Sequence, residues 1–352
     1  MLKVIVCGTT FGKNYIDAIK KIDKLKLVGI LASGSKRSFE YAKKNHVPLF
    51  KNVDMLPGDI DIAFVVIGSS VLGGSGTNIA LSLLRKGISV MQEHPVNYKE
   101  IQECYKEANC NGVFYRIGNL YNSLNNLEVF KKCTKYLNKN DELNYVDILT
   151  SSQMVYTQLS ILNSTIPSFR NFRINASLSE KRYPFSRVVL SNGNTNINMQ
   201  IHNEISNEDK NNYMYVLHRM TYFYGGGRLE LEDTFGSVVW RSRMYVSEES
   251  EVLNKELNIK CLNEEEIKFK DLISSVFSNC IVEEIKKFIH EINSKKANAS
   301  LALSEILISQ KWSEIMKEIG FPISIQQIQK LPYHSSKIKE IGEKYGDRFI
   351  KK

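Results

Sequence analysis

The segment LKVIVCGTTFG, residues 2–12, decides the fold of this 352-residue chain. Leu2–Val6 is an apolar run of strand length, and it leads into a turn that contains Gly8 and Gly12. Apolar side chains then recur at helical spacing, at Tyr15, Ile16, Ala18, Ile19 and Ile22. A strand that passes through a glycine-containing turn into a helix is the setting in which proteins bind the pyrophosphate of a dinucleotide.

Strands and helices alternate in the same way up to about residue 120. Further strands are expected at Leu25–Ala32, Ile60–Ile67, Ile88–Gln92 and Val113–Ile117, and helices at Ser38–Asn45, Asn78–Lys86 and Tyr98–Ala108. Repeated units of this spacing predict a doubly wound parallel sheet, which has its ligand crevice at the carboxyl ends of the strands. We therefore predict a dinucleotide-binding Rossmann domain over residues 1–122.

The pattern changes in the second part of the chain. A strand at Tyr145–Thr150 and a helix at Gln153–Leu162 precede two expected hairpins, one turning at Asn192-Gly193 and one at Thr234–Gly236. Helices return at about Ile267–Asn293, Ala297–Gly320 and Ser335–Tyr345. Residues 123–352 are therefore predicted to form an α+β domain with a large, mostly antiparallel sheet, which binds substrate and offers a face for a homodimer.

Composition excludes several classes of protein. Hydrophobic residues make up 43% of the chain and charged residues 24%, as in globular proteins, so a disordered chain is excluded. The six cysteines match no zinc-binding spacing, and no metal site is expected. The N-terminus lacks a signal-peptide pattern and the longest apolar runs are too short to span a bilayer, so we expect a cytoplasmic protein without a membrane segment.

The net charge is +9, which is compatible with nucleic acid, an acidic partner protein or a phosphorylated cofactor. The lysines are scattered and no nucleic-acid-binding motif is present, so nucleic acid is not expected as a partner. An acidic partner protein stays compatible with the charge.

The first candidate site is the turn after the first strand. A strict GxGxxG motif requires glycine at positions 7, 9 and 12, and this chain keeps only Gly12, with Gly8 one place away. An ordinary strand-to-helix turn is the alternative. The residues expected to bind a dinucleotide here are Gly8, Thr9, Thr10, Phe11 and Gly12.

The second candidate site follows the second strand. An NAD site has an acidic residue about 20 residues after the glycine turn, which binds the ribose 2′-hydroxyl. This chain has hydroxyls and cations there instead, which suit a 2′-phosphate, and a polar loop without a ligand is the alternative. The sequence therefore predicts NADP rather than NAD, held by Ser33, Gly34, Ser35, Lys36, Arg37 and Ser38.

Two more candidate sites lie at strand ends. The Gly- and Ser-rich loop Gly68–Thr77 predicts a ligand loop, with Ser69 and Ser70 at the cofactor, or else a flexible connector. Glu93-His94-Pro95 follows the strand at Ile88–Gln92, which places an imidazole at the crevice rim with Glu93 at the cofactor. Tyr121 is a second candidate proton donor, and for both His94 and Tyr121 a structural role is the alternative.

At these positions the sequence resembles the thiazolinyl imine reductases of siderophore biosynthesis, a branch of the glucose–fructose oxidoreductase and inositol dehydrogenase family. The wider family carries Glu-Lys-Pro, with a catalytic lysine, where this chain has Glu93-His94-Pro95, and the imine reductase branch shares the histidine. The segments that carry the resemblance are VIVCGTTFGKNY (4–15), VGILASGSKRS (28–38), VVIGSSVLGGSGT (65–77), VMQEHP (90–95), GNLY (118–121) and GGGRLELEDTFGSVVW (225–240).

The resemblance implies a function as well as a fold. The implied reaction uses NADPH to reduce a thiazoline ring to a thiazolidine, and it needs no metal. The implied substrate is tethered by phosphopantetheine to a carrier domain of a nonribosomal peptide synthetase. His94 and Tyr121 match the residues that supply the proton in that branch. Two alternatives stay open: an NADP-dependent reductase or dehydrogenase of a sugar, polyol or other small imine, and an NADP-binding module without turnover.

Overall fold

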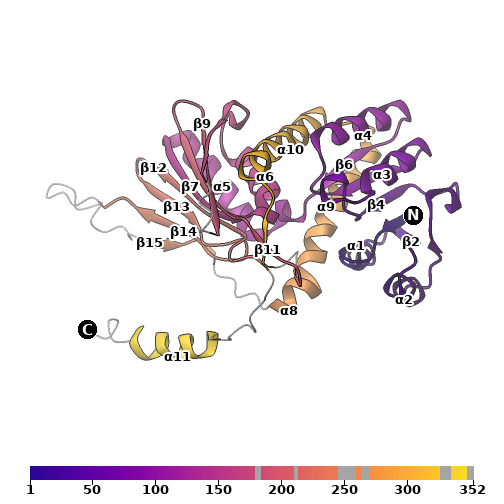
Figure 1. Cartoon of the computed structure of the whole chain (residues 1–352), viewed down its shortest axis with the longest axis horizontal. Helices are drawn as coiled ribbons and strands as arrows, with labels where there is room; N and C mark the ends of the chain where they lie inside the picture. The colour runs from indigo at the N-terminus through magenta and orange to yellow at the C-terminus, as the bar shows by residue number, and fades with distance from the viewer. Residues whose placement is uncertain (179–183, 210–212, 245–258, 264–268, 326–333, 347–352) are drawn as a thin grey trace.

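The computed structural model describes residues 1–178, 184–209, 213–244, 259–263, 269–325 and 334–346 (Figure 1). Its N-terminal part is built on a six-stranded sheet in which every neighbouring pair of strands is parallel. The spatial order of the strands is β3-β2-β1-β4-β5-β6, so the direction of winding reverses between β1 and β4. These strands are β1 (Leu2–Cys7), β2 (Leu25–Leu31), β3 (Leu49–Phe50), β4 (Ile62–Val65), β5 (Ser89–Glu93) and β6 (Tyr115–Gly118).

Helices cover both faces of this sheet, and this explains the composition of its strands. The last four residues of β1 and all four of β4 are buried, so neither strand alternates between apolar and polar residues. The predicted doubly wound parallel sheet is confirmed. The connecting helices are α1 (Gly12–Ile19), α2 (Lys36–Lys44), α3 (Gly76–Arg85) and α4 (Tyr98–Cys110), with short helices η1 (Val53–Met55) and η2 (Ser70–Leu72).

The second sheet has eight strands in the order β15-β14-β13-β12-β7-β10-β9-β8. All its neighbours are antiparallel except β7 and β10, so the predicted mostly antiparallel sheet is confirmed. Both expected hairpins are present, and Gly193 in the first turn has a φ of +94°. The strands are β7 (Leu143–Ser151), β8 (Arg173–Leu178), β9 (Phe185–Ser191), β10 (Asn196–His202), β12 (His218–Tyr224), β13 (Gly227–Leu231), β14 (Val238–Ser242) and β15 (Ile259–Cys261).

The remaining elements include the helices that connect the two sheets. The helix α9 packs against α1, and α10 packs against both α4 and α6, so the C-terminal helices return to the first domain (Figure 1). The predicted domain boundary at residue 122 falls within η3. These elements are η3 (Leu120–Ser123), α5 (Asn125–Asn140), η4 (Ser152–Met154), α6 (Val155–Thr165), η5 (Phe169–Asn171), α8 (Phe269–Asp271), η6 (Leu272–Val276), α9 (Phe277–Ser294), α10 (Ala299–Ile319) and α11 (Ser335–Gly346), with the strand pair β11 (Glu204–Ser206) and β16 (Ile323–Ile325). Within the described ranges, none of the helices has the length and apolar character needed to cross a membrane.

A buried carboxyl group joins α10 to the first sheet. Glu305 on α10 accepts hydrogen bonds from the Ile117 backbone N–H at 3.2 Å and from the Tyr105 hydroxyl at 2.7 Å. Burial raises the pKa of Glu305 to about 8, although these two donors and the charge of Arg116 pull the pKa down. The carboxyl group is therefore largely protonated at neutral pH, and it attaches α10 to β6 and α4 without a buried charge.

We predict that Glu305→Gln makes the folded protein less sensitive to pH. The unfolded chain ionises Glu305 near its ordinary pKa of 4.5, whereas the folded chain does so only near 8, so the wild type loses stability as pH rises through this window. Because glutamine does not ionise, the variant should gain stability relative to the wild type over the same window, by up to a few kcal/mol at about 1.4 kcal/mol per pKa unit. Urea unfolding at pH 5 and pH 8 measures the free energy of unfolding of the wild type and the variant, with the exposed Glu314→Gln as control. A difference between Glu305→Gln and the wild type that is the same at both pH values would contradict the prediction.

Candidate functional site

The turn between β1 and α1 has the geometry of an anion-binding site. Gly8 has a φ of +90°, and a Cβ atom there would lie 2.5 Å from the backbone oxygen of Val66, so only glycine fits. Phe11 is the N-cap of α1 and makes no capping hydrogen bond through its side chain, and the first turn of α1 contains no acidic residue. The first N–H groups of this helix are therefore available for a phosphate group.

The loop after β2 lies next to this turn. The Arg37 guanidinium donates from Nη2 to the Thr10 hydroxyl over 2.5 Å, and both Lys36 and Arg37 are exposed. Ser38 is buried, and its hydroxyl donates to the Ser35 backbone oxygen at 2.7 Å, so it stabilises the start of α2. Since residues 32–38 contain no carboxylate, the exposed cations and Thr10 form a surface that fits a 2′-phosphate.

The loop Gly68–Thr77 is compact, and the hydroxyl groups of Ser69, Ser70 and Thr77 already have protein partners. Ser69 is buried and donates to the Pro95 backbone oxygen at 2.7 Å, while Ser70 donates to the Glu100 carboxylate. A Cβ atom on Gly76 would lie 2.2 Å from the backbone oxygen of Ile67, so this glycine allows two backbone segments to approach each other. In this structure Ser69 holds the segment that contains His94. A contact between Ser69 or Ser70 and the cofactor stays a prediction.

His94 follows β5, and its ring has a defined orientation. Nδ1 lies 2.8 Å from the Gly118 backbone oxygen and 3.1 Å from Glu93 Oε1. Both oxygens accept hydrogen bonds, so Nδ1 carries a proton and Nε2 is the nitrogen that gains and loses one. Burial alone lowers the pKa of His94, but the hydrogen bond and charge of Glu93, with the Gly118 carbonyl, raise it above 6.5 overall.

Tyr121 lies beside His94, as the predicted pair of proton donors requires. It belongs to η3, and its ring centroid lies 6.4 Å from that of His94 in an edge-to-face arrangement. Its hydroxyl lies 3.9 Å from the sulfur of Met154. Burial, together with the charge of Glu93, raises the pKa of Tyr121, so its hydroxyl keeps its proton at neutral pH.

Two residues that the sequence analysis did not select complete this cluster from the second domain. Tyr156 on α6 stacks on the His94 ring at a centroid distance of 5.3 Å, and its buried hydroxyl has no hydrogen-bond partner among the described residues. His218 on β12 lies 5.2 Å from the Tyr121 ring centroid. The alternating pattern of β12 indicates that His218 faces inward, but only the packing of the two domains places it beside Tyr121.

His218 is a neutral structural neighbour of the cluster. Its Nδ1 lies 2.7 Å from the Thr234 hydroxyl, and its Nε2 lies 2.6 Å from the Thr157 hydroxyl. Burial lowers the pKa of His218 to about 3, so the ring carries no charge at neutral pH. It therefore adds no positive charge next to His94 and orients the elements that surround Tyr121.

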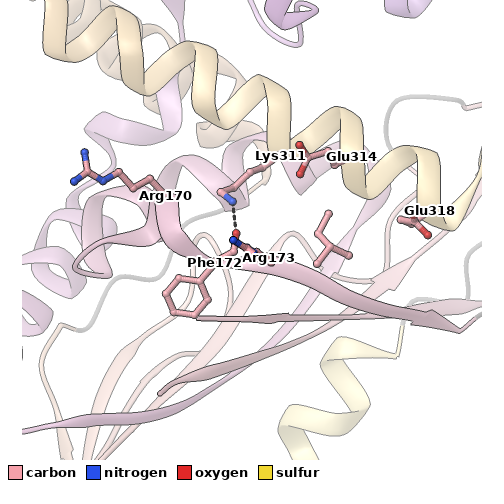
Figure 2. Close-up of a pocket in the computed structure, with 7 residues that line it drawn as sticks. Arg170, Phe172, Arg173, Lys311, Glu314 and Glu318 are labelled. Atoms are coloured by element: carbon pink, nitrogen blue, oxygen red, sulfur yellow. Dashed lines mark hydrogen bonds between the residues drawn. The ribbon is translucent and has the colours of Figure 1, made fainter. Parts of the chain in front are cut away.

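A large cavity lies away from these residues. It has a volume of about 640 Å³ and lies between α10 and the start of β8, where Lys311 donates to the Phe172 backbone oxygen (Figure 2). It contains none of the candidate site residues, and acidic side chains on α10 line it together with basic ones. We therefore place the reactive site at the strand ends and not in this cavity. In the part of the chain that the structure describes, His, Cys, Asp and Glu side chains form no group that could hold a metal ion.

Two family models match separate parts of the chain. A model described as an oxidoreductase family with an NAD-binding Rossmann fold matches residues 2–119, which contain the glycine turn and His94. Residues 2–119 are therefore similar to the Rossmann domain of this oxidoreductase family. A second model, described as thiazolinyl imine reductase Irp3-like, C-terminal, matches residues 141–241 of the chain. A search of curated proteins found no match.

Solved structures of other oxidoreductases share the fold over nearly the whole chain. One is KijD10, a 3-ketoreductase from Actinomadura kijaniata in complex with NADP and TDP-benzene, with a TM-score of 0.67 and 10% identity over 92% of this chain and 99% of that chain. Another is the UDP-N-acetylglucosamine 3-dehydrogenase GnnA from Acidithiobacillus ferrooxidans, with a TM-score of 0.62 and 12% identity over 89% of this chain and 96% of that one. The predicted nicotinamide dinucleotide cofactor agrees with the NAD-binding Rossmann model that matches residues 2–119.

We predict that Gly8→Ala impairs both stability and cofactor binding. The methyl group would lie 2.5 Å from a backbone oxygen, at a φ of +90° that alanine disfavours, so a loss of about 2 kcal/mol or more is expected. Gly58→Ala is the control, because nothing lies within 4 Å of its Cβ position. Thermal unfolding and NADPH fluorescence titration measure the two effects, and equal behaviour of the two variants would contradict the prediction.

Proposed function

We propose that this oxidoreductase uses NADPH to reduce the C=N bond of a thiazoline to a thiazolidine, on a substrate tethered to a carrier domain of a nonribosomal peptide synthetase. The observation that carries the proposal is the match of residues 141–241 to the C-terminal model of thiazolinyl imine reductases. This part of the chain includes Tyr156 and His218, which pack around the proposed proton donors. The product would be an intermediate in siderophore or metallophore biosynthesis.

The cofactor preference follows from the loops at the ends of β1 and β2. The N–H groups at the start of α1 would hold the pyrophosphate, and Arg37 with Thr10 would hold the 2′-phosphate, as Lys36 adds a further positive charge. When bound, the nicotinamide supplies the hydride. The chain itself therefore has to orient the substrate and deliver one proton.

His94 is the proposed source of that proton. Addition of hydride to a C=N carbon places negative charge on the nitrogen, and a donor about 3 Å away lowers the barrier by protonating it. Nδ1 of His94 is occupied by the Gly118 carbonyl and Glu93, so Nε2 is the atom that delivers the proton. The raised pKa of His94 keeps a larger fraction of the ring protonated at neutral pH. The neutral hydroxyl of Tyr121 is a second donor to the same nitrogen.

An acidic carrier domain is the proposed partner. The net charge of +9 favours association with an acidic protein, since complementary charge accelerates encounter. A phosphopantetheine arm would then bring the thiazoline to the carboxyl ends of β4 and β5.

Reduction or oxidation of a nucleotide-bound sugar is the second candidate. The structural neighbour GnnA is a UDP-N-acetylglucosamine 3-dehydrogenase, and KijD10 is a 3-ketoreductase crystallised with TDP-benzene. A ketone oxygen needs the same hydride and proton as an imine nitrogen, so the cluster around His94 suits both reactions. The substrate tells them apart: turnover of a nucleotide sugar, with none of a carrier-bound thiazoline, would select the second candidate.

We predict that His94→Ala lowers turnover of a carrier-bound thiazoline by about 10²–10⁴-fold, because the proton donor is lost. NADPH binding should change little. Single-turnover NADPH oxidation and NADPH titration separate the two effects. His290→Ala, an exposed histidine on α9, is the control and should behave like the wild type. Unchanged turnover in His94→Ala would remove His94 from the mechanism.

We predict that Arg37→Ala weakens binding of NADPH but not of NADH, because only NADPH carries the 2′-phosphate. The expected change is about 10-fold or more, as one charge-assisted hydrogen bond contributes about 1.5–3 kcal/mol. Lys43→Ala is the matched control, since Lys43 is exposed in the last turn of the same helix. Fluorescence titrations with both dinucleotides test this, and a parallel loss for NADH would show that Arg37 acts elsewhere.

A further inference from the structure

Glu93 joins the first helix of the protein to the proposed proton donor. Its Oε1 lies 3.1 Å from His94 Nδ1, and its Oε2 accepts a hydrogen bond from the hydroxyl of Tyr15 on α1. The Glu93 side chain is 14% exposed, so it lies mostly inside the protein but still reaches solvent. The carboxylate is therefore held from two sides, by Tyr15 and by the imidazole of His94.

The position of the Tyr15 hydroxyl is itself determined by packing. Tyr15 is buried, and its ring lies against Phe64 of β4 at 5.6 Å and against Phe11 at 6.4 Å between centroids. Burial, followed by the charge of Glu93, raises the pKa of Tyr15, so the hydroxyl keeps its proton and donates. Tyr15 is thus a rigid donor directed at Glu93.

Gly118 shows how closely these groups are fitted together. A Cβ atom at position 118 would lie 2.6 Å from the Tyr15 hydroxyl oxygen and 3.3 Å from Glu93 Oε2. The Gly118 carbonyl is also the acceptor that lies 2.8 Å from His94 Nδ1. The absence of a side chain at residue 118 therefore lets Tyr15 reach Glu93, and its backbone binds the same nitrogen that Glu93 approaches.

The groups that face His94 come from five elements. They are Glu93 from β5, the Gly118 carbonyl from β6, Tyr121 from η3, Tyr156 from α6 and His218 from β12. Burial raises the pKa of both tyrosines and lowers that of His218, so these three are neutral at neutral pH. Glu93 is the acidic group of the set, and its placement decides how strongly His94 holds its proton.

We propose that Tyr15 is a positioning residue for His94: its hydroxyl holds the Glu93 carboxylate against Nδ1, and this keeps the transferable proton on Nε2. Without the hydroxyl, Oε2 of Glu93 loses the donor that the described part of the chain provides, and the carboxylate turns toward water to replace it. His94 then loses its charged partner while it stays buried. The inference rests on the proposed function in taking His94 as the proton donor, but the arrangement of the three side chains can be tested without turnover.

The test is the titration of His94 by NMR in the protein without substrate. In Tyr15→Phe the midpoint of the His94 titration should move to lower pH. Burial lowers the pKa of His94, and a displaced Glu93 carboxylate no longer raises it to the same extent. Tyr222→Phe is the matched control, since it removes another buried tyrosine hydroxyl, which lies 2.7 Å from the Thr165 hydroxyl in the second domain. The control should leave the midpoint unchanged.

A double-mutant cycle with Glu93→Gln separates positioning from a general loss of structure. Glu93→Gln should also lower the midpoint, and adding Tyr15→Phe to it should lower the midpoint no further, because Tyr15 acts through the carboxylate. A wild-type midpoint in Tyr15→Phe, a higher one, or additive shifts in the double variant would each overturn the proposal. If Tyr15→Phe fails to fold, Gly118→Ala displaces the Tyr15 hydroxyl from Glu93 and is judged by the same criteria.

Turnover provides a separate readout. With a thiazoline substrate, kcat of Tyr15→Phe should fall about 10-fold near pH 8 and recover at acid pH, where His94 is protonated in both proteins, while KM changes little. An equal loss of kcat at every pH would overturn the positioning role. If the NMR midpoint shifts as expected but the wild type reduces no thiazoline, the proposed function fails and the role of Tyr15 stands.

Discussion

The hydrogen bond between His94 Nδ1 and the Gly118 backbone oxygen, 2.8 Å long, is the interaction on which the proposed chemistry of this protein depends. It joins the ends of two neighbouring parallel strands, β5 and β6, and it decides which ring nitrogen can act on a substrate. Together with Glu93 it occupies Nδ1; without these two contacts either nitrogen could carry the exchangeable proton, and a raised pKa would not lead to a directed proton transfer. The glycine turns, the buried Ser69 and the Glu93 carboxylate all serve to keep these strand ends in place.

The second domain completes a site that the first domain begins. Tyr156 stacks on His94, and His218 packs against Tyr121, so each proposed donor has one aromatic neighbour from the other half of the chain. The helices α9 and α10 then return to pack on the dinucleotide-binding domain, and Glu305 bonds to β6 as a protonated carboxyl group. These contacts bring residues of the two domains together around the proposed proton donors.

Much of this architecture could be predicted from local patterns. Uninterrupted apolar strands and glycine turns predicted the parallel sheet, and Asn192-Gly193 predicted a hairpin, because these signals depend on residues close together in the chain. The positions of His94 and Tyr121 at adjacent strand ends followed from the same reasoning. The loop Gly68–Thr77 was harder to interpret. Its glycines allow two backbone segments of the protein to approach each other, and the composition of the loop does not distinguish this from the approach of a ligand.

The order of residues along the chain by itself determined the strands of the two sheets, the turn that suits a pyrophosphate and the cations that suit a 2′-phosphate. Each strand, turn or cation cluster is encoded within about ten consecutive residues. It did not determine the neighbours of His94. Tyr15 and Tyr156 lie 79 and 62 positions away from it in the chain, and the packing of α1 and α6 against the strand ends brings them into contact. The protonation state of His94 is set by those distant groups through burial and charge, and both of these quantities exist only once the chain has folded.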